Sequence, residues 1–503
     1  MQNGTVYLVG AGPGDPGLIT VRGQELLRRA DVVVYDHLVS PRLLSWCRPG
    51  VKRVYAGKEA GQHTLSQDAV NTLLVRAART SKVIVRLKGG DPFLFGRGGE
   101  EALALARAGV TYEVVPGVTS ALAVPAYAGI PVTHRQLSSS VAIVTGHEDP
   151  AKPDSAIRWM QLATACDTII FLMGVSTLRA IAGQLIRHGR KATTPCAVIE
   201  RGTWAKQRTV AGTLRTIAAD ARRVGVKAPA VVVVGDVVTL RKKLGWFEDR
   251  PLFGRRILVT RASEKAGTLS EQLERLGAEV EELPAIELAP VHANGALRQA
   301  VQELPKTDWV FFTSPEGVGW FSKWLTPHRK DLRSLAGCHI AAIGPKTAVS
   351  LEERGLHVDF VPKRFSQEGV LEDLPRRMLR GKRALILSAQ ESRDVLTLGL
   401  RRRGMAVRKV PIYRTVLPQA LLRRLDEALG RPIDLVTVTS ASCVEHLHEA
   451  LKATGHPARF RQLRFASIGP VTSQAVCSLG GRVIVEAKTS TIEGLVDAMV
   501  RHG

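Results

Sequence analysis

Residues 86–101 read RLKGGDPFLFGRGGEE, and this stretch decides how the first half of the chain is interpreted. It begins at the end of an apolar run, KVIVRL, that is typical of a buried strand. Open α/β sheets bind their ligands at the carboxyl ends of strands, and this stretch starts at such an end. Gly89 and Gly90 leave backbone groups accessible to a ligand, and the Asp91 carboxylate can accept hydrogen bonds from one. The alternative is a glycine-rich turn with only a capping role, which leaves the charged residues of so short a segment unexplained.

Apolar strand segments alternate with amphipathic helical segments along the whole chain, which indicates an α/β fold. In the first half the strand segments are TVYLVGAG, ADVVVYD, KVIVRLKGG, SSVAIVTGH, DTIIFLMG and APAVVVVGDVV. A polar and charged segment follows them at residues 241–254, and a new strand, RRILVTRA, begins directly after it. We therefore expect a first domain at residues 1–244, a linker at residues 245–254 and a second domain at residues 255–503.

The second half contains a weak internal repeat. WVFFTSPEGV is similar to LVTVTSASCV, and IAAIGPKTA is similar to FASIGPVTS. Each copy therefore pairs a strand that ends in a Thr-Ser turn with a strand that ends in an Ile-Gly-Pro turn, which predicts two similar lobes. Two segments, residues 283–290 and 410–418, are suited to cross between the lobes. If both cross, the first and last thirds of this half fold together and the middle third is inserted.

The composition of the 503 residues is that of an ordinary soluble protein, with 45% hydrophobic and 23% charged residues. The sequence has neither an apolar run of about 18 residues nor a signal-peptide pattern, so we expect a cytoplasmic protein with no membrane association. The 6 cysteines form neither a C-x-x-C motif nor a cluster with histidine, so we expect no disulfide framework and no metal. The net charge of +24 attracts nucleic acid, anionic membranes or acidic small molecules, and composition alone does not choose among them.

Two further motifs in the first half have the form of ligand-binding loops. Residues 10–15, GAGPGD, connect a strand to a helix, but Asp15 occupies the third glycine position of the dinucleotide fingerprint, which excludes that interpretation. Residues 115–121, VPGVTSA, place the hydroxyl groups of Thr119 and Ser120 at the start of a helix. These hydroxyl groups either cap the helix or contact a ligand.

The first half contains, in this order, the segments GAGPGDPGLIT, YDHLVS, RLKGGDPFLFGRGGEE, VPGVTSA, PVTHR, FLMG and ERGT. Together these segments resemble uroporphyrinogen-III C-methyltransferase, a family of the tetrapyrrole methylase superfamily. The resemblance implies a homodimer of two-lobe α/β subunits that bind S-adenosylmethionine (SAM) in the cleft between the lobes. It also implies that uroporphyrinogen III is methylated at two ring carbons to give precorrin-2.

The resemblance further implies the roles of individual residues. It assigns SAM binding to Pro13, Gly89, Gly90, Asp91, Leu94, Thr119, Ser120, Met173 and Gly202. It makes Asp36 the proton acceptor and Lys58 the proton donor, and it places Arg86 and Arg97 near the carboxylates of the substrate. The alternatives are that Asp36 caps a neighbouring turn and that Lys58 is a solvated surface lysine. The residue types suit the chemistry, because an arginine fork pairs bidentately with a carboxylate and a base must manage a proton during methylation.

The second half contains, in order, ILVTRA, FTSPEGV, AAIGPKTA, PIYRT, VTSAS and SIGPVTS. This set resembles uroporphyrinogen-III synthase, which implies two lobes joined by a two-stranded hinge, with the active site in the cleft. The implied reaction closes hydroxymethylbilane and inverts its last pyrrole ring. The resemblance matches Tyr413 to a residue that helps the hydroxyl group leave, and a partly buried hinge tyrosine is the alternative. The candidate carboxylate contacts are Arg261, Thr313, Ser314, Ser388, Thr439, Ser440 and Thr472.

The two resemblances together predict a fused enzyme of the sirohaem and cobalamin branch of tetrapyrrole synthesis, with polycarboxylate tetrapyrroles as its substrates. The main alternative is a methyltransferase whose second half is only an inactive docking module. The net positive charge could also indicate a nucleic-acid-binding protein, but two observations disfavour this interpretation. Aromatic residues make up only 5% of the chain, and no nucleic-acid-binding module is visible.

Overall fold

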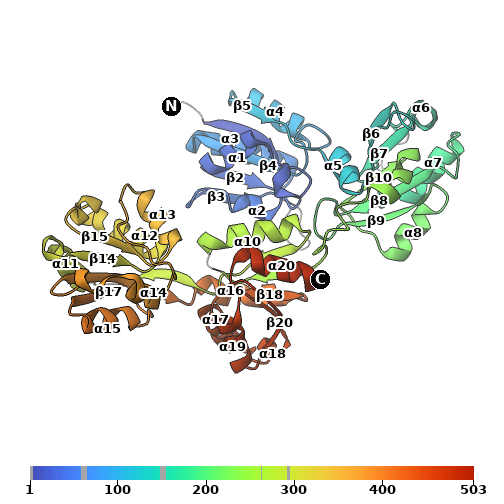
Figure 1. Ribbon diagram of the computed structural model, residues 1–503. Helices are drawn as coiled ribbons and strands as arrows, with labels where there is room; N and C mark the ends of the chain where they lie inside the picture. The colour runs from blue at the N-terminus through green and yellow to red at the C-terminus, as the bar shows by residue number, and fades with distance from the viewer. Residues whose placement is uncertain (1–3, 58–64, 148–154, 262, 292–294, 503) are drawn as a thin grey trace. The chain divides into compact units, whose positions relative to one another are not determined.

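The computed structural model describes residues 4–57, 65–147, 155–261, 263–291 and 295–502. The chain divides into two compact units, which comprise Met1–Arg255 with Leu273–Glu279 and Arg256–Gln272 with Val280–His502. Each unit contains two five-stranded sheets with packed helices (Figure 1), which confirms the predicted α/β class. Within the described ranges, no helix is both long enough and apolar enough to cross a bilayer.

The first sheet is parallel throughout and lies between two layers of helices. In sheet order its strands are β3 (Lys52–Tyr55), β2 (Val32–Tyr35), β4 (Val83–Lys88), β1 (Thr5–Gly10) and β5 (Tyr112–Val115). One face packs against α1 (Val21–Arg29) and α2 (Pro41–Leu44), and the other packs against α3 (Gln67–Thr80) and α4 (Gly98–Arg107). The central strands are covered on both faces, which explains their uninterrupted apolar sequences.

The second sheet of this unit is mixed, because β10 runs antiparallel to both of its neighbours. In sheet order its strands are β6 (Val141–Thr145), β7 (Thr168–Leu172), β10 (Ala230–Val234), β8 (Pro195–Glu200) and β9 (Arg208–Thr213). One face is covered by α6 (Trp159–Ala165), α7 (Leu178–Arg187) and α8 (Ile217–Val224), and the other by α5 (Ser120–Tyr127). Helix α5 directly follows the last strand of the first sheet and so connects the two sheets.

The second unit consists of two lobes joined by paired strands. In sheet order the strands of one lobe are β12 (Glu279–Glu282), β11 (Arg256–Val259), β18 (Leu435–Val438), β19 (Arg464–Ser467) and β20 (Arg482–Glu486). Those of the other lobe are β13 (Glu287–Pro290), β17 (Ala406–Val416), β16 (Arg383–Ala389), β14 (Trp309–Phe312) and β15 (His339–Ala342). The two segments that were predicted to cross pair with each other as antiparallel β13 and β17. The predicted two-stranded hinge and the inserted middle third are therefore confirmed.

The predicted repeat is also confirmed by the order of elements in the two lobes. Strands β14 and β18 each lead through a Thr-Ser turn into a helix, α12 (Pro315–Leu325) or α17 (Ala441–Ala453). Their sheet neighbours β15 and β19 each lead through a Gly-Pro turn into α13 (Pro345–Glu352) or α19 (Pro470–Ser478). The other helices of the unit are α10 (Ser263–Arg275), α11 (Gly295–Gln302), α14 (Gln367–Asp373), α15 (Val395–Arg402), α16 (Gln419–Leu429), α18 (Arg459–Gln462) and α20 (Ile492–His502).

The segment that was predicted to be a linker, residues 245–254, packs within the first unit. The Phe247 side chain is only 3% exposed, and its ring centroid lies 4.8 Å from that of Tyr127 at the end of α5. The Glu248 carboxylate accepts a hydrogen bond from the Gln207 side chain at 2.9 Å and pairs with Arg241 of α9 (Arg241–Leu244) at 2.6 Å. The segment is therefore an ordered support for α5 rather than an extended connection.

Replacing Phe247 by alanine is expected to lower the free energy of unfolding of the first unit by about 3 kcal/mol, because it opens a cavity under α5. Urea unfolding followed by tryptophan fluorescence would measure the change, since Trp246 adjoins the cavity. Leu244→Ala is the control, because the Leu244 side chain is 48% exposed and should contribute less than about 1 kcal/mol. Equal losses in the two variants would show that Phe247 does not support the helix.

Candidate functional site

The topology of the first sheet marks one position at which a ligand can bind. Strand β2 leads through α2 to β3 on one side, and its neighbour β4 leads through α4 to β5 on the other side and over the opposite face. Open α/β sheets bind ligands at such a switch point, beyond the carboxyl ends of the two strands. The residues at these ends are Asp36 after β2 and Gly89 after β4. Their loops touch, because a Cβ atom on Gly89 would lie 2.5 Å from the Cβ atom of Leu38.

Three glycine-containing motifs meet backbone to backbone beside this position. The backbone N–H group of Gly90 donates to the carbonyl oxygen of Gly12 at 2.7 Å, which joins the loops after β4 and β1. A Cβ atom on Gly117, in the loop after β5, would lie 2.3 Å from the carbonyl oxygen of Gly90 and 2.6 Å from the Cα atom of Gly10. Only glycine fits at these contacts, because the obstructing atoms belong to the backbone.

The Asp91 carboxylate joins two of these loops. One of its oxygens accepts hydrogen bonds from the backbone N–H groups of Phe93 at 2.8 Å and Leu94 at 3.0 Å, and the other accepts from that of Gly117 at 3.0 Å. The predicted role of Asp91 was to accept hydrogen bonds from a ligand. In the structure both carboxylate oxygens accept from backbone N–H groups, so Asp91 organises the loops around the site, and its predicted contact with a ligand stays a prediction.

Helix α5 links the predicted binding residues of the two sheets. At its start the Thr119 hydroxyl group accepts a hydrogen bond from the backbone N–H group of Ala121 at 3.3 Å and so caps the helix. Capping was one of the two roles that the sequence left open for this hydroxyl group. At its end the Tyr127 hydroxyl group donates to the Asp15 carboxylate at 2.7 Å. Between them Gly202 lies against the helix, since a Cβ atom there would be 2.3 Å from a methyl carbon of Val124. The predicted contact Ser120 is the first residue of α5, and a Cβ atom on Gly90 would lie 3.8 Å from its backbone nitrogen.

Several motif residues have strained backbones. Phe95, Arg97 and Met173 have φ values of 53°, 58° and 57°, in the left-handed region that side-chain-bearing residues rarely adopt. Arg201 and Thr203, on either side of Gly202, share this conformation. Such strain persists only where the surroundings enforce it, and it concentrates at functional sites.

The side chains of the motifs in the first unit differ in exposure. The Phe93 and Phe95 side chains are 55% and 43% exposed, and that of Met173 is 50% exposed. Pro13 accepts a hydrogen bond at its carbonyl oxygen from the Trp204 indole at 3.3 Å, and Leu94 packs partly buried against the core beneath α5. The site therefore presents an apolar surface beside the glycine loops. The predicted proton donor, Lys58, lies outside the described residues.

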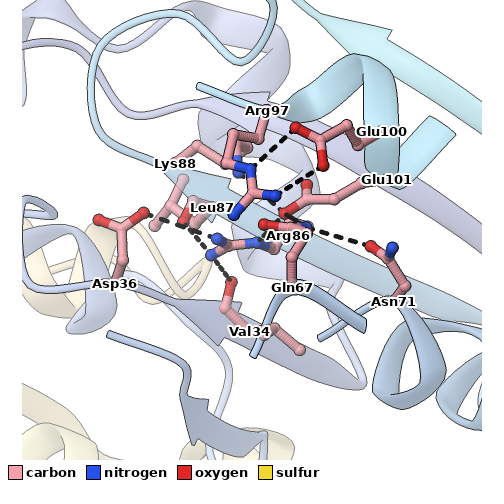
Figure 2. Close-up of polar contacts among 10 residues, drawn as sticks. All are labelled: Val34, Asp36, Gln67, Asn71, Arg86, Leu87, Lys88, Arg97, Glu100 and Glu101. Carbon is pink, nitrogen blue, oxygen red and sulfur yellow. Dashed lines mark hydrogen bonds and ion pairs between the residues drawn. The ribbon is translucent and has the colours of Figure 1, made fainter. Parts of the chain in front are cut away.

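A buried cluster of charged side chains lies behind the switch point (Figure 2). The Glu101 carboxylate, which is 0% exposed, accepts from the Arg86 guanidinium at 3.2 Å and from the Lys88 ammonium at 2.9 Å. The other end of the Arg86 guanidinium faces the Asp36 carboxylate at 3.7 Å. Burial lowers the pKa of Lys88 and the adjacent Arg86 lowers it further, whereas Glu101 raises it. Two cations and two anions are thus arranged in one network that reaches from the interior to Asp36.

The two arginines predicted near substrate carboxylates have different surroundings. The Arg86 side chain is 6% exposed and pairs with Glu101 and Asp36, so it lies behind the surface of the site, and its predicted contact with a substrate carboxylate stays a prediction. The Arg97 side chain is 57% exposed and pairs with Glu100 at 2.7 Å, so its guanidinium remains accessible. Sequence reasoning gave no role to Glu101 or Lys88. The available signal was the placement of basic residues at the start of the motif and acidic residues at its end.

In the second unit, one group of predicted residues gathers at the carboxyl ends of β14, β16 and β17. The Tyr413 side chain is buried, and its hydroxyl group lies 2.9 Å from that of Ser314, which caps α12. The Thr313 hydroxyl group donates to the Leu387 carbonyl oxygen at 3.2 Å, and Ser388 is fully buried. Burial raises the pKa of Tyr413 above its usual range. The phenol therefore stays protonated at neutral pH and can donate a proton or a hydrogen bond.

The second group lies in the other lobe, after strands β11, β18 and β19. Arg261 follows β11, and Thr439 and Ser440 follow β18. The Ser440 hydroxyl group accepts from the backbone N–H group of Cys443 at 3.2 Å and so caps α17. Thr472 is buried in the first turn of α19. The structure therefore divides the predicted contacts between the carboxyl edges of two sheets.

Comparison with known proteins identifies both halves. Residues 5–218 match the family of tetrapyrrole (corrin/porphyrin) methylases, and residues 267–497 match the family of the uroporphyrinogen-III synthase HemD. The porphyrin biosynthesis protein HemD of Ruminiclostridium josui is 38% identical over 100% of this chain and 99% of its own length. The uroporphyrinogen-III C-methyltransferase of Bacillus subtilis is 39% identical over 78% of each chain.

A third relative covers the first unit alone. The S-adenosyl-L-methionine-dependent uroporphyrinogen III methyltransferase of Methanosarcina barkeri is 52% identical over 48% of this chain and 95% of its own length. The boundary between the two units, at Arg255 and Arg256, falls between the two family matches, and the full-length relative aligns across both units. The chain therefore belongs to the family of proteins in which a tetrapyrrole methylase is fused to a uroporphyrinogen-III synthase.

Proposed function

We propose that the chain is a bifunctional enzyme of tetrapyrrole synthesis. Its second unit closes hydroxymethylbilane to uroporphyrinogen III with inversion of ring D. Its first unit methylates this product twice, with SAM as the methyl donor, to give precorrin-2. The observation that carries the proposal is the cluster of glycine loops at the β2–β4 switch point, next to the Asp36 carboxylate. The relative that matches the whole chain supports the pairing of the two activities.

The residues of the first unit fit SAM. The close packing of Gly10, Gly90 and Gly117 leaves no side chain between these loops, so a ligand can approach their backbone. The exposed rings of Phe93 and Phe95 offer an apolar surface of the kind that covers an adenine base. When bound, SAM supplies a methyl group on a sulfonium that an electron-rich pyrrole carbon attacks in line, and holding both partners in place supplies much of the rate.

Asp36 is the proton acceptor in this proposal. One of its carboxylate oxygens accepts from the backbone N–H group of Leu38 at 3.1 Å and the other faces Arg86, while the side chain stays 20% exposed. A held but accessible carboxylate can take the proton that leaves the methylated ring carbon. The exposed Arg97 guanidinium can exchange its Glu100 partner for a carboxylate of the substrate.

In the second unit the buried Tyr413 hydroxyl group, backed by Ser314, assists departure of the hydroxyl group of hydroxymethylbilane. The leaving hydroxyl group departs readily, so the main task of the unit is to hold the flexible chain in the geometry of the correct closure. Hydroxyl groups and helix N-termini on both lobes suit the carboxylates of this substrate. The homodimer, the cytoplasmic location, the assigned SAM contacts and the sirohaem or cobalamin destination are further parts of this proposal.

Tyr413→Phe is expected to slow cyclisation about 10-fold, less than the loss usual for a general acid, because the leaving group departs readily. The ratio of type III to type I uroporphyrinogen, measured by chromatography, should fall with the rate. Since the pKa of Tyr413 is raised, the wild-type rate should show no loss from this group until the pH rises above about 10. Tyr112→Phe, at a 40% exposed tyrosine of the first unit, is the control. Equal cyclisation rates in the two variants would show that the Tyr413 hydroxyl group does not take part in the reaction and that Tyr413 is only a structural residue of the hinge.

A coupled assay tests the proposed function directly. The full chain receives hydroxymethylbilane with and without SAM, and the products are separated and weighed. The proposal predicts uroporphyrinogen III without SAM and a species two methyl groups heavier with it. Formation of the spontaneous type I isomer alone would make the second unit a docking module. Added type III substrate would then show whether the first unit methylates on its own.

A further inference from the structure

The first and last residues of the stretch 86–101 form an ion pair, which closes the glycine-rich loop between them. Arg86 lies on β4 and Glu101 on α4, and their side chains meet at 3.2 Å in the interior (Figure 2). Lys88 joins them from the same strand, since residues two apart in a strand point to the same face. We propose that Glu101 is a positioning residue for methyl transfer, acting through Arg86 on Asp36. This inference rests on the proposed function of the first unit.

The electrostatics of the cluster require Glu101. Arg86 and Lys88 are two buried cations on one face of β4, and buried charges are costly unless they are paired and hydrogen-bonded. A single oxygen of Glu101 accepts from both cations, and also from the Gln67 side chain of α3 at 3.3 Å. Without this anion, Asp36 would be the remaining ion-pair partner of Arg86, and the Arg86 guanidinium would be drawn toward it.

The geometry shows how Glu101 fixes Arg86. The Nε atom of Arg86 donates to Glu101, and the Nη1 atom donates to the Val34 and Leu87 carbonyl oxygens at 3.5 and 3.2 Å. These partners orient the planar guanidinium so that Nη2 faces the Asp36 carboxylate at 3.7 Å. Of the two anions in the cluster only Asp36 reaches solvent, so it is the member that can meet a substrate.

The pKa of Lys88 supports the same arrangement. Burial lowers this pKa and Arg86 lowers it further, while Glu101 and then Asp36 oppose the shift. The charged groups that face the Lys88 ammonium are Arg86 from β4, Glu100 and Glu101 from α4, and Asp36 from the loop after β2. Removing the Glu101 charge is therefore expected to lower the pKa of Lys88 further, so that the Lys88 ammonium loses its proton at a lower pH than in the wild type.

The test is Glu101→Gln in the full chain, which keeps the shape of the side chain and removes its charge. We expect kcat of methyl transfer to fall about 30-fold, because the reacting groups lose their alignment, while the Kd for SAM stays within about 3-fold of the wild type. The alkaline side of the rate profile should move to lower pH. Glu101→Asp, which restores the charge on a shorter side chain, should recover part of kcat.

Glu113→Gln is the matched control, because this exposed carboxylate on β5 forms only a surface pair with Arg22 at 3.3 Å and should leave kcat unchanged. Cyclisation by the second unit in the same preparation monitors the integrity of each variant. If Glu101→Gln does not fold, the double variant Lys88→Met with Glu101→Gln removes one charge of each sign. Low kcat in a folded double variant would support positioning through Arg86, and full kcat would reduce Glu101 to a counter-charge for Lys88.

The failure of this inference is distinguishable from failure of the proposed function. If the wild-type chain does not methylate uroporphyrinogen III, the proposed function is wrong. If the wild type methylates and Glu101→Gln keeps its kcat and pH profile, only the positioning role is wrong. Parallel losses of kcat and SAM affinity would indicate a general collapse of the loop and would overturn the specific role through Asp36.

Discussion

Replacing Gly117 by alanine is expected to abolish SAM binding and to lower the free energy of unfolding of the first unit by about 3 kcal/mol. The added methyl group would lie 2.3 Å from the carbonyl oxygen of Gly90 and 2.6 Å from the Cα atom of Gly10. If the obstructing atoms belonged to a side chain, that side chain could rotate away. They are backbone atoms of two loops, so the loops must separate to admit the methyl group. Calorimetric titration with SAM and thermal unfolding would measure the two effects.

Gly183→Ala is the matched control for this substitution. Gly183 lies in the interior of α7, and a Cβ atom there would meet nothing within 4 Å. Alanine has the higher helix propensity, so this variant should be more stable by up to about 1 kcal/mol. Normal SAM affinity in Gly117→Ala would mean that the close approach of the loops does not shape the binding site, and the SAM assignment would lose its main support.

Most central strands of the four sheets were predictable, whereas most edge strands were not; β8, which is central and buried, was also missed. The segments identified as strands from sequence alone include β1, β4, β7, β10 and β14, which are buried and apolar. The strands that were missed include β3, β5, β9, β12 and β20, and each of these lies at the edge of its sheet. An edge strand is covered less completely, so it retains polar residues, as in KRVY and EVEE, and loses the apolar signal.

The motifs of the site were predictable, but the partners of its charged residues were not. The resemblance placed Asp36, Arg86 and Asp91 at one site, and the structure brings their loops together. It did not reveal that the Asp91 carboxylate would accept hydrogen bonds from backbone N–H groups or that Arg86 would be buried against Glu101. These facts depend on how α4 packs on β4, and the basic start and acidic end of the motif do not by themselves specify which side chains meet across the loop.

The role of the linker segment was unpredictable for a related reason. Residues 241–254 are charged and polar as a run, which is typical of a connection between domains. Within this run Phe247 and Leu252 are buried, and Glu248 pairs with Arg241. Composition averages over the run, whereas packing depends on which of its few apolar residues point inward. The consequence for function is that the segment supports the end of α5, whose start adjoins Gly90 at the proposed SAM site.

Asp36→Asn is expected to reduce methyl transfer by about 100-fold or more and to leave cyclisation unchanged. The amide oxygen of asparagine can still accept from the backbone N–H group of Leu38, so the turn after β2 is preserved. The change removes the basic carboxylate and the negative charge that faces Arg86. Precorrin-2 formation from supplied uroporphyrinogen III and closure of hydroxymethylbilane, measured on one preparation, would separate the two activities.

Asp31→Asn, at the other end of the same strand, is the control that separates stability from chemistry. Its carboxylate accepts from the backbone N–H groups of Lys82 and Val83, and these bonds lower the pKa of Asp31. Because folding lowers its pKa, the Asp31 carboxylate stabilises the fold at pH values above its pKa in the unfolded chain, and this contribution is lost as the pH falls. Asp31→Asn should remove this pH-dependent contribution to the free energy of unfolding. It should keep its methyl-transfer rate, because Asp31 lies at the amino end of β2. If Asp36→Asn behaves like Asp31→Asn, losing stability but not turnover, the carboxylate caps a turn and the base must be sought elsewhere. A loss of turnover at Asp36 alone would assign the proton transfer to the carboxyl end of the strand, where the fold places a ligand.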